Sequence, residues 1–375
     1  MATKRKFKLK PKAIKILKVL GIILAILLVI LFIYRKNINS LKELGYSEKA
    51  ANTILFSMKK EEVMLVGKSK TLNKAFESDD YKEKNFTSYS KIKYQQGENL
   101  IKNINTLLKK GYNNDEISII LAHGTDKDVT EFAKRKKVRY LDEFYTFKFA
   151  KIKNYDRYVN YMNESREDEE TSVLYVNIDL DKENYKDPIE VKKFSYNMLV
   201  NKHRKLGAKF IPDGLSTIPS SLTSEKGLKA NKVAIEEAKK MIADAKKEGM
   251  NIIINSAYRS YKDQEEVVST YQKLYGDSYI EKYVLKPGFS EHQTGLGFDF
   301  GSTTSKIFVE SNEYKWMEKN CYKYGFIHRF KTNYEDVTGI KNEAWHYRYV
   351  GKKIAKYCYT NDITLEEYYA RFLDK

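Results

Sequence analysis

An unbroken apolar run near the N-terminus constrains this chain more than any other feature of its sequence. Residues 19–34 form 16 consecutive apolar positions, and counting back to Ile14 extends the segment to 21 residues. Lys15 and Lys18 lie in this extension, where their long side chains can reach lipid headgroups. Because about 20 helical residues cross the ~30 Å hydrocarbon layer of a bilayer, we predict a transmembrane helix over 14–35.

The charges around this run predict its orientation. Residues 1–36 carry ten Lys and Arg and no acidic residue, and eight of the ten precede the run. Since basic residues mark the cytoplasmic side of a membrane helix, we expect a cytoplasmic basic tail over 1–13, a single pass through the cell membrane and an extracellular catalytic or binding domain. A cleaved signal peptide is the competing interpretation, but residues 32–36 contain no small-x-small cleavage site.

The rest of the composition excludes several classes of protein. Apolar residues at 42% and aromatic residues at 13% exclude wholesale disorder, and 375 residues allow roughly two globular domains. Two cysteines, Cys321 and Cys358, exclude a disulfide scaffold, and the sequence leaves open whether they pair. Of the net charge of +18, +8 remains beyond residue 36, which suits anionic wall polymers as partners. The chain has no recognisable nucleic-acid-binding motif, so we expect no nucleic acid partner.

Residues 39–135 contain a weak internal repeat with an offset of 66. Leu41–Tyr46 aligns with Leu107–Tyr112, and the same offset places Ile54 over Ile120. Each copy predicts a short helix that ends at glycine, followed by a second, capped helix. We therefore expect a small helical repeat module in which no chemistry is visible.

Residues 136–227 are predicted to form a connecting segment that leads into the next domain. A tyrosine-rich stretch, 144–161, and residues 172–178 have the pattern of strands. An acidic loop, 164–170, separates them. His203, near the end of this segment, is expected on the surface.

Residues 228–375 alternate between helix and strand signals. Helices are expected over 234–245, 261–275 and 313–324, the second one opened by a capping box at Ser260. Strands are expected over 251–256, 296–300, 326–330 and 345–350. This order predicts an α+β fold with a small antiparallel sheet and flanking helices.

Two segments of this domain carry the pattern of a metal site. Residues 290–299 read Ser-Glu-His-Gln-Thr-Gly-Leu-Gly-Phe-Asp, and residues 343–346 read Glu-Ala-Trp-His. Two imidazoles and one aspartate suit a borderline ion such as Zn²⁺ and leave a fourth position for water. The glutamate of the second segment is then free to act as a base. Each of these residues is commonplace alone, so the prediction depends on their combination.

In this combination the region resembles the zinc D-alanyl-D-alanine carboxypeptidases of the vancomycin-resistance (VanY-type) family. The signature of that family is Ser-x-His-x-x-Gly-x-Ala-x-Asp followed by Glu-x-x-His. Further segments that resemble the family are 199–202, 210–215, 256–260, 338–340 and 346–351. The resemblance covers about residues 172–360 and does not extend to 39–132.

The resemblance implies an enzyme with one zinc ion that removes the C-terminal D-alanine from peptidoglycan stem peptides. By position, it assigns the zinc ligands His292, Asp299 and His346, the general base Glu343, the oxyanion-stabilising Arg259, and the substrate-binding Ser290 and Gln264. Three positions depart from the family: Gly297 replaces a small alanine, Ala344 a proline, and Phe330-Lys331 a Tyr-Pro pair. These departures leave the metal and base positions intact and affect the expected shape of the rim and the substrate preference.

Three alternatives remain open at the level of the sequence. The first is an L,D-carboxypeptidase that acts on tetrapeptide stems. The second is a serine D,D-peptidase, since Ser57–Lys60, Ser195–Asn197 and Lys331–Asn333 imitate its short motifs. The third is a non-catalytic cell-envelope protein with a structural zinc site, which would need a fourth protein ligand.

Overall fold

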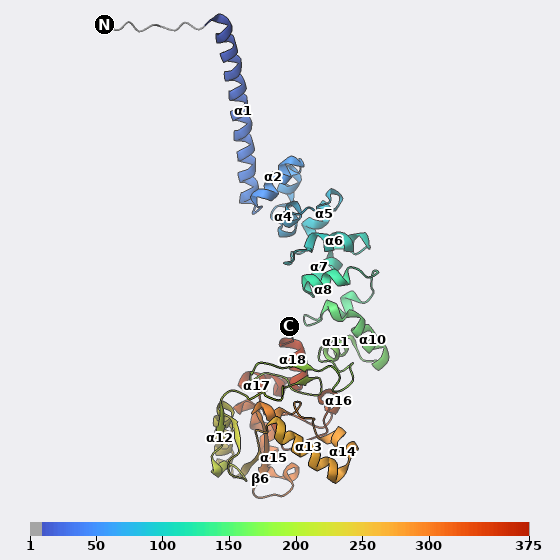
Figure 1. Cartoon of the computed structure of the whole chain (residues 1–375), viewed down its shortest axis with the longest axis vertical. Coiled ribbons are helices and arrows are strands. Elements are labelled where there is room, and N and C mark those ends of the chain that lie inside the picture. The colour runs from blue at the N-terminus through green and yellow to red at the C-terminus, as the bar shows by residue number, and fades with distance from the viewer. Residues whose placement is uncertain (1–9, 375) are drawn as a thin grey trace, which may run out of the picture. The chain divides into compact units, whose positions relative to one another are not determined.

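The computed structural model describes residues 10–374, and the first nine residues of the predicted basic tail lie outside the described residues. The chain divides into two compact units. The first comprises Met1–Tyr145 and Lys151–Lys153, and the second comprises Thr146–Ala150 and Asn154–Lys375. Figure 1 shows the order of the elements along the chain.

The first unit is helical. Its elements are α1 (Pro11–Glu43), α2 (Glu48–Phe56), α3 (Lys60–Val66), α4 (Lys70–Glu77), η1 (Glu83–Asn85), α5 (Phe86–Lys91), α6 (Leu100–Lys109), α7 (Asn114–Ala122), α8 (Asp126–Phe132) and α9 (Leu141–Tyr145). The short helix η2 (Ile152–Asn154) follows where the chain passes into the second unit. Within residues 10–374, α1 is the one helix long and apolar enough to cross a membrane; its apolar window has a mean hydropathy of 3.2 and is not buried. It contains the predicted segment 14–35.

The internal repeat has the same helix boundaries in both copies. Helices α2 and α7, and likewise α3 and α8, are related by the offset of 66 residues that the sequence indicates. Gly45 and Gly111, at equivalent positions, both have a positive φ, 91° and 86°, as glycine readily adopts after a helix. Ile54 and Ile120 are both fully buried. The two copies therefore fold alike around the same apolar positions.

The second unit opens with helices where strands were predicted. Its first elements are α10 (Tyr155–Ser165) and α11 (Glu169–Asn177). The strand predictions over 144–161 and 172–178 are therefore wrong. The acidic loop supplies the start of a helix: the Asp168 side chain accepts a hydrogen bond from the backbone N–H of Thr171, and Glu169 and Glu170 occupy the first turn. Because α11 is buried on more than one side, its apolar residues lack a clear helical period.

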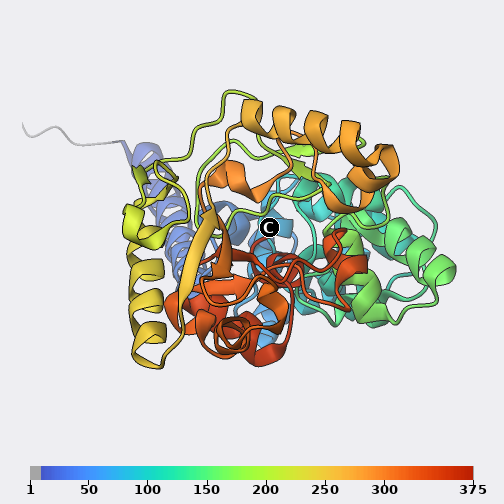
Figure 2. The same ribbon diagram turned by 90° about the horizontal axis from the view of Figure 1, so that it is seen from below.

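Two short strand pairs and one short helix connect this start to the main sheet. They are the parallel pair β1 (Ile189–Glu190) and β2 (Arg204–Lys205), the antiparallel pair β3 (Leu215–Thr217) and β4 (Lys229–Asn231), and η3 (Ser220–Leu222). Helix α12 (Lys232–Lys247), yellow in Figure 2, follows β4 directly. Its Asn231 cap accepts hydrogen bonds from two backbone N–H groups of the first turn.

The main sheet has four antiparallel strands in the order β5-β6-β8-β7. The strands are β5 (Ile252–Ser256), β6 (Gly297–Ser302), β7 (Phe326–His328) and β8 (His346–Tyr349). The remaining elements are α13 (Tyr261–Tyr275), α14 (Asp277–Tyr283), η4 (Glu291–Thr294), η5 (Phe308–Glu310), α15 (Asn312–Asn320), η6 (Cys321–Tyr324), α16 (Glu335–Thr338), α17 (Lys352–Asn361) and α18 (Leu365–Phe372). The predicted helices, strands and capping box of residues 228–375 are confirmed, with ends shifted by a few residues.

Alternation along the strands separates a core face from a functional face. Phe298, Phe300 and Tyr347 are fully buried and belong to one apolar cluster with the inner face of α12. Because successive side chains of a strand point to opposite faces, Asp299 and His346 lie on the other face. Both cysteines are buried and free, and burial raises the pKa of each thiol to about 12.

Candidate active site

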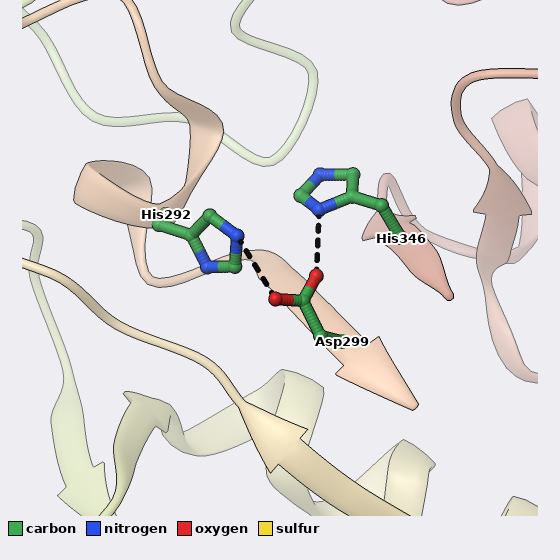
Figure 3. A group of neighbouring side chains, drawn as sticks. All are labelled: His292, Asp299 and His346. Carbon is green, nitrogen blue, oxygen red and sulfur yellow. Dashed lines mark hydrogen bonds and ion pairs between the residues drawn. The ribbon is translucent and has the colours of Figure 1, made fainter. Parts of the chain in front are cut away.

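The sheet register brings two of the predicted ligands together. Asp299 on β6 is paired directly with His346 on β8. His292 comes from the short helix η4, which turns at Gly295 (φ 66°) into β6. Figure 3 shows both imidazoles beside the carboxylate of Asp299. The Nδ1 of His346 lies 2.9 Å from Oδ1 of Asp299, and the Nε2 of His292 lies 3.5 Å from Oδ2.

In each imidazole, the ring nitrogen that does not face Asp299 also has a hydrogen-bond partner. The Nδ1 of His292 donates a hydrogen bond to the carbonyl oxygen of Ala257 at 2.5 Å, so its Nε2 faces the aspartate. The Nε2 of His346 lies 3.4 Å from Oε2 of Glu291, so its Nδ1 faces the aspartate. Such outer hydrogen bonds fix the orientation of metal-ligating histidines.

Glu291 is a buried carboxylate that the sequence reasoning did not single out. Its Oε1 accepts hydrogen bonds from Nε of Arg329 and from a terminal nitrogen of Arg348, both at 2.9 Å. Burial alone would raise the pKa of Glu291, but the two guanidinium groups and His346 lower it well below its usual range. A permanent negative charge therefore lies behind His346. No local pattern reveals it, because its partners lie 38 to 57 residues further along the chain.

The charges at the site favour a cation between the three predicted ligands. Burial lowers the pKa of His346, but Asp299 and Glu291 outweigh it and raise the pKa to about 9. Burial raises the pKa of Asp299, and the two imidazoles lower it by more. The carboxylates of Asp299 and Glu291 thus favour a positive charge at this point, and a divalent cation would take the place of the proton on His346.

The donor set fits a zinc ion. One ligand atom from each of His292, Asp299 and His346 lies within 4.8 Å of the others, and within the described part of the chain this group has three members. Two imidazoles and one carboxylate are ligands that zinc takes in catalytic sites, where three protein ligands leave a position for water or substrate. A fourth ligand that would close the site is not found among residues 10–374.

Glu343 and Arg259 lie on the same cleft. Burial raises the pKa of the Glu343 carboxyl to about 7, which suits a group that must accept and then release a proton near neutrality. Arg259 is half-buried, forms no ion pair among the described residues and donates a hydrogen bond to Oε1 of Gln264 at 2.7 Å. Its own backbone N–H bonds the carbonyl oxygen of His292 at 3.2 Å, which links it to the metal-site turn.

Gln264 and Ser290 line the cleft, but their side chains also form hydrogen bonds within the protein. Besides accepting from Arg259, Gln264 donates from Nε2 to the carbonyl oxygen of Leu285 at 2.7 Å. Both ends of its amide are thus engaged, and the contacts indicate that Gln264 positions Arg259. The hydroxyl of Ser290 accepts a hydrogen bond from the backbone N–H of His292 and caps η4.

A single cleft of about 640 Å³ contains every residue predicted for the site. These residues are Arg259, Gln264, Ser290, His292, Asp299, Glu343 and His346. Aromatic side chains form much of the remaining wall, namely Tyr271, Tyr279, Tyr283, Phe330 and Trp345. The cleft is therefore open to a peptide, with the metal-site group and Glu343 on a common wall.

The aromatic neighbours of His346 and the histidines outside the motif have other environments. Trp345 is 46% exposed on the cleft, whereas Tyr347 is buried in the core. His328 bonds the carbonyl oxygen of Glu343 and pairs with Glu318, which is a structural arrangement. The expectation that His203 lies on the surface is wrong: it is buried beside Asp179 and Arg204, and burial lowers its pKa.

Two of the three segments that imitate serine-peptidase motifs make hydrogen bonds or ion pairs within the protein. The hydroxyl of Ser57 donates to the carbonyl oxygen of Ile54 at the end of α2, and Lys331 pairs with Asp362. Ser57 belongs to the first unit, whereas Ser195 and Lys331 belong to the second. These contacts give no support to a serine nucleophile.

Comparison with known proteins identifies the family of the second unit's sheet region. The family model VanY, D-alanyl-D-alanine carboxypeptidase, matches residues 227–352. Residues 227–352 are a VanY-family domain. The chain is 39% identical over 181 residues to YodJ of Bacillus subtilis (strain 168). The aligned residues cover 46% of this chain and 66% of that protein. It spans between 43% and 66% of the length of the curated relatives that it matches.

Two solved structures are also similar to the chain. One is the LdcB LD-carboxypeptidase, with 40% identity, covering 46% of this chain and 85% of that one, at a TM-score of 0.43. The other is a variant of the vancomycin resistance D,D-pentapeptidase VanY in complex with Zn(II), with 29% identity, covering 46% and 99%, at a TM-score of 0.42. The match to the VanY family, rather than either structure, identifies the domain.

Proposed function

We propose that the chain is a membrane-anchored, outward-facing zinc carboxypeptidase that removes the C-terminal D-alanine from peptidoglycan stem peptides. The observation that carries the proposal is that one ligand atom from each of His292, Asp299 and His346 lies close to the others. The ring nitrogen of each histidine that faces away from Asp299 has a hydrogen-bond partner, and Glu343 lines the same cleft. The VanY-family match over 227–352 supports the same chemistry and substrate. Helix α1 supports the anchor, and the charges around it support an outward-facing domain.

In this proposal His292, Asp299 and His346 would hold one zinc ion. Zinc supplies a Lewis acid and lowers the pKa of water to about 7. Glu343 takes the proton of the attacking water and passes it to the amine of the departing D-alanine. Its pKa of about 7 allows both transfers, because neither protonation state is strongly favoured at neutral pH.

Arg259 is proposed to stabilise the negative charge that develops on the attacked carbonyl oxygen. A guanidinium group stays charged at any working pH, and Gln264 holds it at the wall of the cleft. Removing one such donor typically costs about 2.7–4 kcal/mol of barrier. Glu291 takes no part in proton transfer in this scheme; it orients His346 from behind.

The test is release of free D-alanine by the full-length chain, purified in detergent with zinc, from pentapeptide and tetrapeptide stems. Release from the pentapeptide supports the proposal, and release from the tetrapeptide alone would replace it with an L,D-carboxypeptidase. Glu343→Gln should abolish release while zinc binding and folding persist. If neither stem is cleaved although zinc is bound, the site is structural and the enzymatic proposal fails.

A further inference from the structure

The turn between α2 and α3 exposes large apolar side chains to an unusual degree. Met58, Leu65 and Phe56 are 91%, 89% and 82% exposed, the highest values for large apolar side chains among the described residues. Met58 also has a positive φ of 55°, which is uncommon for a residue with a side chain. Exposed apolar side chains that lie this close together in the sequence indicate a surface that meets a partner or a membrane.

The second copy of the repeat shows that the fold does not require these residues. The offset of 66 relates Phe56, Met58 and Leu65 to Ala122, Gly124 and Glu131. Helices α2 and α3 have the same boundaries as α7 and α8, although the backbone of the intervening turn differs, since Met58 has a positive φ and Gly124 does not. The apolar side chains therefore have a role that is specific to the first copy of the repeat.

The first copy is attached to α1 at the end of the apolar run. The hydroxyl of Tyr34, the last residue of that run, donates a hydrogen bond to Oδ1 of Asn52 on α2. The Nζ of Lys60, at the start of α3, donates to Oδ1 of Asn37 on α1 at 2.7 Å. Leu65 lies near the end of α3, whereas the α2–α3 turn, with Phe56 and Met58, lies between these two attachments in sequence. The turn is therefore held beside the part of α1 where the apolar run gives way to Arg35 and Lys36, and Figure 1 shows α2 alongside this end of α1.

We propose that the α2–α3 turn inserts Phe56, Met58 and Leu65 into the lipid interface of the bilayer that α1 crosses. The inference rests on the proposed membrane anchor and is independent of the proposed enzymatic activity. A bilayer is the occupant that continuity with α1 indicates, since Tyr34, the last residue of the exposed apolar run, bonds Asn52 on α2, one helical turn before Phe56. Apolar side chains at the headgroup boundary are stabilised by removal from water. The turn would give the first repeat a second attachment that limits its motion about α1.

The repeat supplies matched probes for the test. Full-length Phe56→Trp and Ala122→Trp place an indole at equivalent, exposed positions of the two copies. Each is reconstituted in vesicles of phosphatidylcholine and phosphatidylglycerol with brominated acyl chains, which quench nearby tryptophan. After subtraction of the parent signal, we expect at least twofold greater quenching for Phe56→Trp. Equal quenching at the two positions would overturn the proposal.

Two further variants separate the possible failures. Leu24→Trp reports on the anchor, since Leu24 lies in the middle of the apolar run. Quenching of Leu24→Trp without quenching of Phe56→Trp rejects the inserted turn and leaves the anchor in place, whereas no quenching of Leu24→Trp rejects both. Leu65→Trp with Glu131→Trp repeats the comparison if an indole at residue 56 disturbs the turn, and the same twofold difference is expected.

Discussion

At the scale of single residues, Glu291 is the charge on which the order of the candidate site depends. It contacts His346 on one side and pairs with Arg329 and Arg348 on the other, Arg329 also pairing with Glu366, and all of these groups are nearly inaccessible to solvent. Removing one partner of a buried ion pair leaves an uncompensated charge, which typically costs 3–5 kcal/mol. A buried carboxylate in this position therefore contributes both to folding and to the orientation of a metal ligand.

We predict that Glu291→Gln lowers the free energy of unfolding by about 3 kcal/mol or more, because it leaves buried Arg348 without a carboxylate and leaves Arg329 with Glu366 alone. It should also weaken zinc binding about 10- to 100-fold, since loss of an outer partner of a ligating histidine has effects of this size. Urea unfolding and competition with a zinc chelator measure the two quantities. Glu343→Gln is the matched control and should change neither much; similar values for both variants would contradict the assigned role.

The candidate ligands could be predicted from the sequence and Glu291 could not. His292, Asp299 and His346 belong to short motifs with characteristic spacing, so residue type and order were sufficient. Glu291 stands next to His292, but its role depends on Arg329 and Arg348, which only the folded sheet brings close. Pairing across strands is set by tertiary structure, and a single sequence does not reveal it.

At the scale of elements, α14 contacts α13 through aromatic side chains, besides hydrogen bonds from Gln272 and Lys202. None of its residues is buried. Tyr279 stacks on Tyr275 of α13 at 4.6 Å and on Tyr283 at 4.8 Å, measured between ring centroids, and lies parallel to Tyr271 at 6.0 Å. Since Tyr279 and Tyr283 also line the cleft, the position of α14 determines the shape of that wall.

We predict that Tyr279→Ala loosens α14 and raises KM for the stem peptide more than it lowers kcat. Aromatic pairs contribute about 0.5–1.5 kcal/mol each, and the variant loses three. Hydrogen exchange of residues 277–283 should become at least several-fold faster, with no change in α12. Tyr279→Phe keeps the rings and should behave like the parent; if it also raises KM, the hydroxyl and not the stacking is responsible.

A second element-scale prediction concerns Asp179, which follows α11. It pairs with Arg157 of α10 at 2.9 Å, with Lys182 at 2.8 Å and with Arg204 of β2 at 3.6 Å. Burial raises the pKa of Asp179, but the three cations lower it by more, to below its ordinary value of 3.8. Its contribution to stability is therefore fully present above the unfolded-state pKa of about 3.9 and is lost as the pH falls through the lower folded-state pKa.

The measurement for Asp179 is urea unfolding of the parent and of Asp179→Asn between pH 6 and pH 2.5. The parent should be more stable at pH 6, and the difference should shrink below about pH 4 as the carboxylate becomes protonated. A difference that stays constant over this range would show that the ion pairs do not account for the effect. Glu183→Gln, at an exposed pair with Lys186, should be close to neutral throughout.

Element boundaries were predictable where capping residues mark them. Ser260 begins α13 with a capping box, and Gly325 ends the helical stretch before β7 with a positive φ. The helix α11 was predicted as a strand because its apolar residues point in several directions and lack a helical period. Its cap at Asp168 and its acidic first turn were in the sequence and were the better signal.

At the scale of the whole molecule, α1 is the candidate for attachment of the chain to a membrane. The predicted span accounts for residues 14–35, but the helix continues to Glu43, and Ile38 and Leu41 in this extension are buried against the first unit. An apolar helix that continues into a folded unit in this way is better suited to an anchor than to a removable leader. Removal of the run by a signal peptidase would also remove Tyr34 and its contact with Asn52.

We therefore predict that the mature protein keeps its N-terminus. Its intact mass, measured by mass spectrometry of detergent-extracted membranes, should match the full chain of 43.9 kDa, and alkaline carbonate should not release it. A protease added to intact cells should cleave exposed loops beyond residue 43 and leave residues 1–36 in the membrane fraction, because basic residues favour the cytoplasmic side of a membrane helix. A mass smaller by about 35 residues would instead identify the run as a signal peptide. Resistance to protease in intact cells but not in lysed cells would show that the orientation is the reverse of the predicted one.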